Sequence, residues 1–362
     1  MKNKIDMVNA IIIFIMVSFK YLKMYELFSE IVLYGYLAIL VIFVIANIYK
    51  MELSKKEYLT ILILVAFAGF TFVTNRDVNL LVSIFVALLF LKRDNKEFVK
   101  YFMWSSILMF CATIALNIIG VLDTNSMIRN TEEGRITRYA LGFESPNAVF
   151  LYFMPIMFAF YYVYGENKKA IAIFAILGTI LFYLTNCRTG FILTILFFIY
   201  IIICKDNMPK KIKKALPYLF IIFSILTFVI AIYYGKTQTP ELNEMLSGRP
   251  ALWNYYYEQG LYKSMTGGNL NEEYILDSFY LHIMVHLGLI SYVFYLIVYY
   301  KSSKTLGKDG RALNILLFYL LYGLVETNTV LASTNFIVVL QFKSLILDKQ
   351  IKGEIESGAR KN

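Results

Sequence analysis

Charged side chains are scarce in this chain of 362 residues, and so are cysteine and histidine. Asp, Glu, Lys and Arg together make up 17% of the residues, against about a quarter of an average soluble protein. The three cysteines, Cys111, Cys187 and Cys204, lie far apart without a C-x-x-C pair, which excludes a disulfide framework and a cysteine-built zinc site. His282 and His286 are the only histidines, so few side chains titrate near neutral pH. The composition therefore excludes an ordinary soluble enzyme.

Apolar residues make up 59% of the chain and gather in stretches close to the 20 or so residues that a helix needs to cross a bilayer. The sequence predicts an all-α polytopic membrane protein, a single integral membrane domain over residues 1–362 with about 12 transmembrane helices. The predicted limits are 7–22, 28–48, 58–74, 78–91, 99–122, 146–164, 169–186, 188–204, 215–234, 277–300, 311–326 and 328–347. Eleven or thirteen spans stay open as alternatives, because 78–91 is short and only one polar cluster divides 169–204. The first stretch lacks a small-x-small cleavage site, so we interpret it as an anchor and not as a secretion signal.

The basic residues predict the orientation of these spans. With both termini in the cytoplasm, 25 of the 35 lysines and arginines fall on the cytoplasmic side, as the positive-inside rule requires. The net charge of +10 then reflects membrane topology, and we expect no nucleic-acid partner. Two connections on the outer side are longer than turns, residues 123–145 and 235–276, and we expect the chemistry there.

Arginine and lysine are distributed differently between the two sides. Six of the nine arginines fall outside, but only four of the lysines do. Those arginines are Arg76, Arg129, Arg135, Arg138, Arg188 and Arg249. Because a guanidinium binds phosphate or carboxylate oxygens in pairs, the outer side is interpreted as an anion site. The alternative is that these arginines snorkel or pair with the outer carboxylates Glu132, Glu133, Glu144 and Glu241.

Several positions in these outer segments suit an anionic substrate. Ser145 before Pro146 predicts a capped helix start, whose free backbone N–H groups attract anions or merely begin an ordinary helix. Arg188 lies between two apolar runs with no acidic residue nearby along the chain, which favours a functional role over an interfacial anchor. Residues 250–260 predict a short surface helix, on which Trp253 either stacks on sugar rings or belongs to a membrane aromatic belt.

A carboxylate and two histidines follow one another along the next predicted helix. Asp277, His282 and His286 are spaced by five and four residues, and the histidine pair resembles half of a metal site. Without a third histidine or an outer cysteine pair we expect no metal. Hydrogen bonding within the bundle is the expected role of His286, and lining of the site that of His282.

Four motifs, spread over residues from about 100 to 300, resemble those of the Wzy-type polymerases of surface polysaccharides, which share a membrane fold with the O-antigen ligases. They are Gly142–Asn147 opening a span, Cys187-Arg188-Thr189-Gly190 where relatives have a Ser-Arg-Gly-like turn, Ser247-Gly248-Arg249 with Trp253, and Asp277–Leu281 running to Gly288-Leu289. In this family an arginine, and also a histidine, with ten residues between it and a glycine form functional patterns. Here Arg249 precedes Gly260 and Asp277 precedes Gly288 at that spacing, so aspartate stands where ligases have histidine.

The resemblance implies glycosyl transfer at the outer face of a bacterial cytoplasmic membrane, by which lipid-linked oligosaccharide repeat units are joined into a surface polysaccharide. The donor is a growing glycan on undecaprenyl pyrophosphate, the acceptor is a lipid-linked repeat unit, and a flippase and a chain-length regulator of the same pathway are candidate partners. No cofactor and no metal are implied.

The expected site has catalytic residues and residues that bind the substrate. Asp277 is the candidate base with His282 as second choice, and Arg249 and Arg188 hold the pyrophosphate. The remaining substrate-binding candidates are Arg135, Arg138, Asn147, Trp253 and Tyr280.

Two other functions stay open. A ligase that moves glycan onto another acceptor uses the same outer arginines but favours histidine at position 277. A flippase of lipid-linked sugars needs cations buried along its path, and the predicted spans carry no lysine or arginine near their middles, Lys20 near the end of the first being the nearest approach.

Overall fold

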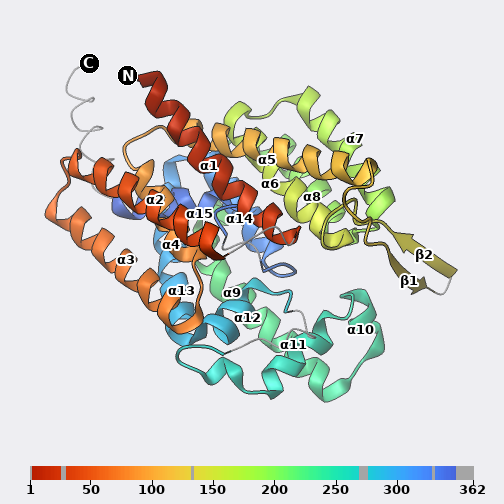
Figure 1. Ribbon diagram of the computed structural model, residues 1–362. Coiled ribbons are helices and arrows are strands. Elements are labelled where there is room, and N and C mark those ends of the chain that lie inside the picture. The colour runs from red at the N-terminus through yellow and green to blue at the C-terminus, as the bar shows by residue number, and fades with distance from the viewer. Residues whose placement is uncertain (1, 26–29, 132–133, 269–275, 328–330, 348–362) are drawn as a thin grey trace. The chain divides into compact units, whose positions relative to one another are not determined.

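The computed structural model describes residues 2–25, 30–131, 134–268, 276–327 and 331–347, which are mostly helical (Figure 1). The helices before residue 206 are α1 (Lys2–Met24), α2 (Glu30–Tyr49), α3 (Lys55–Asn75), α4 (Asn79–Leu89), α5 (Asn95–Ile118), α6 (Pro146–Tyr164), α7 (Lys168–Thr185) and α8 (Arg188–Cys204). Those after it are α9 (Lys210–Thr237), α10 (Pro240–Met245), α11 (Arg249–Glu258), α12 (Phe279–His282), α13 (Gly288–Thr305), α14 (Gly310–Tyr322) and α15 (Phe336–Ile346). Short turns of 3₁₀-helix are η1 (Leu261–Lys263) and η3 (Leu306–Lys308), and η2 (Ile283–Leu287) is π-helical.

The prediction of a helical membrane protein is confirmed in outline. Seven helical segments are long and apolar enough to cross a membrane. They are Ile31–Tyr49, Lys55–Asn75, Asn95–Ile118, Pro146–Tyr164, Lys168–Thr185, Lys210–Thr237 and Phe279–Lys308. The other five predicted spans coincide with shorter apolar helices, namely Met7–Leu22, Asn79–Leu89, Arg188–Cys204, Gly310–Tyr322 and Phe336–Ile346. Twelve spans therefore stay a prediction.

Many large apolar side chains are exposed on the outward faces of these helices. Ile31 on α2 is 82% exposed, Val73 on α3 is 74% exposed and Ile203 on α8 is 73% exposed. Soluble monomeric proteins rarely expose contiguous apolar surface of this extent, whereas lipid tails cover it at no free-energy penalty. The exposed apolar faces and the apolar length of the helices therefore both indicate a protein that spans a membrane.

Local sequence explains where several helices begin. The predicted cap of α6 is confirmed, because the Ser145 side chain accepts a hydrogen bond from the backbone N–H of Ala148 at 3.2 Å and Pro146 occupies the first turn. At the start of α3, Ser54 and Glu57 form a reciprocal capping box.

The chain divides into two compact units, which we describe separately. Unit 1 comprises Met1–Ile42, Arg93–Met208 and Ala332–Phe336, and unit 2 comprises Phe43–Lys92, Pro209–Leu331 and Ile337–Asn362.

In unit 1, helix α6 is buried along most of its length, and α8 packs closely against it. A Cβ atom at Gly190 would lie only 2.4 Å from the Cβ of Phe150, so only glycine permits this approach. Unit 1 also contains an antiparallel hairpin of β1 (Met127–Thr131) and β2 (Gly134–Arg138) within the predicted outer loop. The sequence does not predict this hairpin, because two strands of five residues give too weak a pattern.

In unit 2, the predicted span 277–300 is a helix with a break. The α-helical path changes to a π-helix at Ile283–Leu287, and Gly288 then adopts a φ of +85°. A second chain segment, residues 264–268, packs at the break. Its bonds are from Gly268 N–H to the Val285 carbonyl at 3.0 Å, and from Leu289 N–H to the Ser264 carbonyl at 2.9 Å. These bonds pair backbone groups that a broken helix leaves free.

Candidate functional site

Arg249 and Asp277 form a close ion pair in unit 2. Arg249 is the first residue of α11, which begins after Gly248 in the left-handed conformation, and Asp277 lies two residues before α12. The Nε atom of Arg249 lies 3.3 Å from Oδ2 of Asp277. The structure therefore brings together the residue predicted to hold pyrophosphate and the residue predicted to act as base.

The Arg249 guanidinium is buried but incompletely hydrogen-bonded. Its side chain is 6% exposed, and its Nη1 and Nη2 atoms donate to the carbonyls of Leu246 and Val325 over long distances of 3.4 Å each. Within the described residues Nε makes no hydrogen bond, because its contact with Asp277 is close in distance but not aligned. A guanidinium has five N–H donors, so Arg249 keeps donor capacity for an anion.

The Asp277 carboxyl is largely buried, but part of it stays exposed. Burial raises its pKa above the ordinary value of 3.8, and the nearby Arg249 guanidinium opposes part of this shift. The side chain is still 24% exposed, so a substrate hydroxyl can reach it. A carboxylate with a raised pKa is a stronger base than an ordinary surface aspartate.

Two hydrogen bonds anchor the segment that carries Asp277 to the end of α14. The Phe279 N–H donates to the Gly323 carbonyl at 2.9 Å, and the Tyr280 hydroxyl donates to the Leu320 carbonyl at 2.6 Å. Tyr280 is fully buried, so in this structure it supports the Asp277 segment from the core. A Cβ atom at Gly323 would lie 3.0 Å from the Phe279 ring, which shows how tightly the two segments pack.

Trp253 lies one turn after Arg249 on α11 and is 3% exposed. It belongs to an apolar cluster with Tyr256, Leu276 and Leu281, so its ring packs against protein and is not open to a sugar in this arrangement. Its Nε1 atom is buried without a hydrogen-bond partner among the described residues. Burial of Trp253 fixes the face of α11 that carries Arg249, since residues four apart share a helix face.

The two histidines lie side by side near the break in the helix. His282 is the last residue of α12, and His286 lies in the π-helical turn η2. The ring centroids of His282 and His286 are 5.1 Å apart, and Nδ1 of His286 lies 3.1 Å from the Gly268 carbonyl. The expected hydrogen-bonding role of His286 therefore agrees with its contact. Among the described residues, no group of three or more His, Cys, Asp or Glu side chains is placed to hold a metal ion.

Asn75 makes contacts that no pattern in the sequence predicts. It ends α3, and its Nδ2 atom donates to the carbonyls of Thr266 at 2.8 Å and His286 at 2.7 Å. This amide joins the inserted segment to the broken helix. A Cβ atom at Gly267 would lie 1.9 Å from the His286 carbonyl oxygen, so the close approach also requires glycine there. The pair Gly267-Gly268 was the available sequence signal, but nothing in the sequence connected it with Asn75.

In unit 1, Arg138 joins three elements. Its Nε atom donates to the Thr185 carbonyl at 2.9 Å, and its Nη2 atom donates to Oδ1 of Asn147 at 2.7 Å. The end of β2 is thereby fixed to the end of α7 and the first turn of α6. Two residues predicted to bind substrate, Arg138 and Asn147, thus contact each other.

Arg135 and Arg188 are exposed, on β2 and at the first position of α8. Within the part of the chain that the structure describes, neither forms an ion pair or a hydrogen bond through its side chain. Glu132 and Glu133, the first two of the proposed pairing partners, lie outside the described residues. Glu144 and Glu241 are exposed. The exposed guanidinium groups are therefore accessible to an anion.

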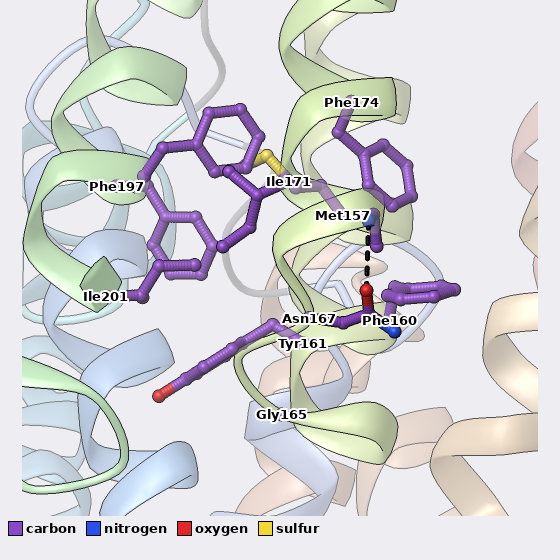
Figure 2. A pocket seen from close by; sticks show the side chains of 11 residues that line it. Met157, Phe160, Tyr161, Gly165, Asn167, Ile171, Phe174, Phe197 and Ile201 are labelled. Carbon is purple, nitrogen blue, oxygen red and sulfur yellow. Dashed lines mark hydrogen bonds between the residues drawn. The ribbon is translucent and has the colours of Figure 1, made fainter.

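Figure 2 shows a small pocket in unit 1 between α6, α7 and α8, with Met157, Ile171 and Phe197 among its lining residues. Its cavity volume is about 10 Å³, at most the room for one water molecule. The dashed line marks the bond from the Ala170 N–H to Oδ1 of Asn167, which caps α7. This pocket is a packing feature and no substrate site.

The candidate residues thus fall into two separate groups, the buried Arg249–Asp277 pair within unit 2, and Arg135, Arg138, Asn147 and Arg188 within unit 1. No family model, curated protein or solved structure matches the chain.

Proposed function

We propose that the chain is a membrane glycosyltransferase that joins lipid-linked oligosaccharide repeat units into a surface polysaccharide. The growing glycan is transferred from undecaprenyl pyrophosphate to a lipid-linked acceptor unit at the outer face of the bacterial cytoplasmic membrane. The observation that carries this proposal is the Arg249–Asp277 pair, a buried cation and a partly exposed carboxyl 3.3 Å apart, directly before an apolar span.

The two members of the pair suit the two charges that develop in this reaction. A hydroxyl of the acceptor sugar attacks the anomeric carbon of the donor, and Asp277 accepts the hydroxyl proton as the new bond forms. The bond from the anomeric carbon to the pyrophosphate oxygen breaks with its electron pair, so negative charge grows on the leaving group. Arg249 has unused N–H donors to stabilise that charge.

The remaining predicted residues have separate roles. Arg188 and Arg135 are exposed cations that attract the pyrophosphate. Arg138 is bonded to Asn147 and Thr185, so its contribution is to hold the hairpin and the ends of α6 and α7 in place. Trp253 and Tyr280 hold Arg249 and Asp277 from within the core. His282 stays the second choice as base.

Deletion of the gene tests the proposal in cells. We expect lipid-bound single repeat units to accumulate while long glycan disappears, and we expect the wild-type gene, but neither Arg249→Lys nor Asp277→Asn, to restore it. A control variant, Met245→Ala, removes an exposed side chain from the same outer segment and should restore polymer fully. Long glycan that persists without attachment to its final acceptor would instead identify a ligase. Accumulation of repeat units on the inner leaflet would identify a flippase.

A further inference from the structure

Unit 1 contains a second, much larger cavity that the chemistry above does not use. It has a volume of about 600 Å³ and lies between α5, α6 and α7. All of its lining side chains are apolar, and four of them are phenylalanines, Phe110, Phe153, Phe160 and Phe174. Cavities that bind small molecules have volumes of about 300–1,000 Å³, so this one has the size of a ligand site and not of a packing defect.

The cavity is a long groove beside the membrane-crossing helices. Its lining on α7 runs from Ala170 to Leu181, and on α5 from Ile107 to Ile118. At 1.5 Å per residue each of these stretches is about 16 Å long, roughly half of the hydrocarbon thickness. Each of the three helices is apolar and long enough to cross a bilayer. The groove therefore fits an extended hydrocarbon chain that lies along the helices.

One end of the groove lies beside polar and cationic groups. Leu181 in the lining is one helical turn before Thr185, whose carbonyl accepts the hydrogen bond from Arg138. Three residues further along the chain, Arg188 begins α8 with an exposed guanidinium. An apolar groove that ends at arginines complements an amphiphile with a long hydrocarbon tail and an anionic head group.

We propose that this groove binds the polyprenyl chain of a lipid-linked substrate, with its phosphate groups at the exposed Arg188. This inference rests on the proposed function, because that function supplies a polyprenyl pyrophosphate. The width favours the same occupant: about 600 Å³ over about 16 Å suits a methyl-branched chain between aromatic rings, and a linear acyl chain fills such a width poorly.

A pair of variants on α7 tests the groove. Leu177 lines it and is 43% exposed, whereas Ile176 is 62% exposed and does not line it. Leu177→Trp places a large ring in the groove, and Ile176→Trp places the same ring on the outer surface of the same helix. Because both side chains are partly exposed, both variants are expected to fold, and a monodisperse elution profile in detergent checks this.

Binding is measured with undecaprenyl phosphate as the probe, on the purified full chain in phosphatidylcholine nanodiscs. We expect Leu177→Trp to weaken binding of the probe at least tenfold and Ile176→Trp to leave it within twofold of wild type. A photoreactive group at the far end of the prenyl chain should cross-link to residues of α5 or α7 that line the groove. Equal binding by both variants, cross-links elsewhere, or displacement of the probe by dipalmitoyl phosphatidylglycerol would overturn the proposal.

The outcome separates this inference from the proposed function. If the chain binds the probe in the groove but forms no polymer, the groove assignment holds and the proposal of a polymerase is contradicted. If Leu177→Trp does not change polymer formation, the proposal of a polymerase holds and the groove assignment is contradicted.

Discussion

At the scale of single residues, we expect Asp277 to determine how the reaction rate depends on pH. Because a base works only when it is ionised, the rate should rise with pH through the pKa of Asp277, which burial raises above 3.8. The nearby Arg249 opposes that rise, so removal of its charge in Arg249→Gln should move the acidic limb of the pH–rate profile to higher pH. Arg249→Lys keeps the charge and should move the limb less. An unchanged acidic limb in Arg249→Gln contradicts the assignment of Asp277 as base.

Substitution of Asp277 separates its role as a base from its role in packing. We expect Asp277→Asn to lower turnover of lipid-linked repeat units by about 10²–10⁴-fold while substrate binding stays near wild type. Asp277→Glu keeps a carboxyl and should recover part of the rate. If His282 is the base instead, Asp277→Asn retains most of the turnover and His282→Gln loses it.

The shape of the Arg249 side chain matters as well as its charge. A guanidinium binds two oxygens of a phosphate at once, whereas the lysine ammonium acts as a point charge. We therefore expect Arg249→Lys to lower kcat by about 10²-fold, the effect of one lost donor to a developing anion. Steady-state kinetics with purified lipid-linked substrate measure this. Wild-type kcat in Arg249→Lys would show that paired contacts are not used.

At the scale of elements, two glycines make opposite predictions about helix packing. Gly190 on α8 approaches α6 so closely that a Cβ atom would lie 2.4 Å from the Cβ of Phe150, whereas a Cβ at Gly178 on α7 would lie 3.5 Å from its nearest neighbour. We expect Gly190→Ala to destabilise the protein by about 1–3 kcal/mol through overpacking, and Gly178→Ala to leave its stability nearly unchanged. Melting temperatures in detergent compare the two, and equal values would contradict the described α6–α8 contact.

The inserted segment beside the broken helix depends on Asn75. Asn75→Asp keeps the side-chain shape but replaces the Nδ2 donor, so the Thr266 and His286 carbonyls lose their partner at a cost of about 1–3 kcal/mol. Hydrogen exchange of the Gly268 and Leu289 amides, which bond across the break, should become faster. Val73→Ala, a change at an exposed position two residues earlier, is the control. If Asn75→Asp leaves the exchange of these two amides unchanged, Asn75 does not hold the inserted segment against the broken helix.

The sequence predicts the helical elements well because each is encoded locally. A long apolar run marks a span, and Ser145 with Pro146 marks the start of α6. The break at Gly288 was not predictable in the same way, because it depends on hydrogen bonds between residues about 200 positions apart, such as Asn75 and His286. Trp253 illustrates the limit at the site, since an aromatic residue of a membrane belt and one of a buried cluster look alike in sequence.

Membrane topology is the prediction at the scale of the whole molecule. The distribution of basic residues predicts that residues 235–276 lie outside and that the connection after α2 lies inside. In a cysteine-free background, Met245→Cys should react with a membrane-impermeant maleimide in intact cells, whereas Lys50→Cys should react only after permeabilisation. Both positions are exposed, so a lack of reaction reports the membrane side and not burial. The reverse pattern would place Arg249 and Asp277 in the cytoplasm and end the proposal of transfer at the outer face.

Reconstituted polymerisation tests the central claim most directly. The purified chain is placed in liposomes with lipid-linked repeat units isolated from cells that lack the gene, and the products are separated by size. We predict a ladder of glycans that lengthens by one repeat unit at a time, with release of one undecaprenyl pyrophosphate for each bond formed, and loss of both products in Asp277→Asn. Unchanged single repeat units in the presence of folded wild-type chain, or a ladder of equal yield from Asp277→Asn, would contradict it.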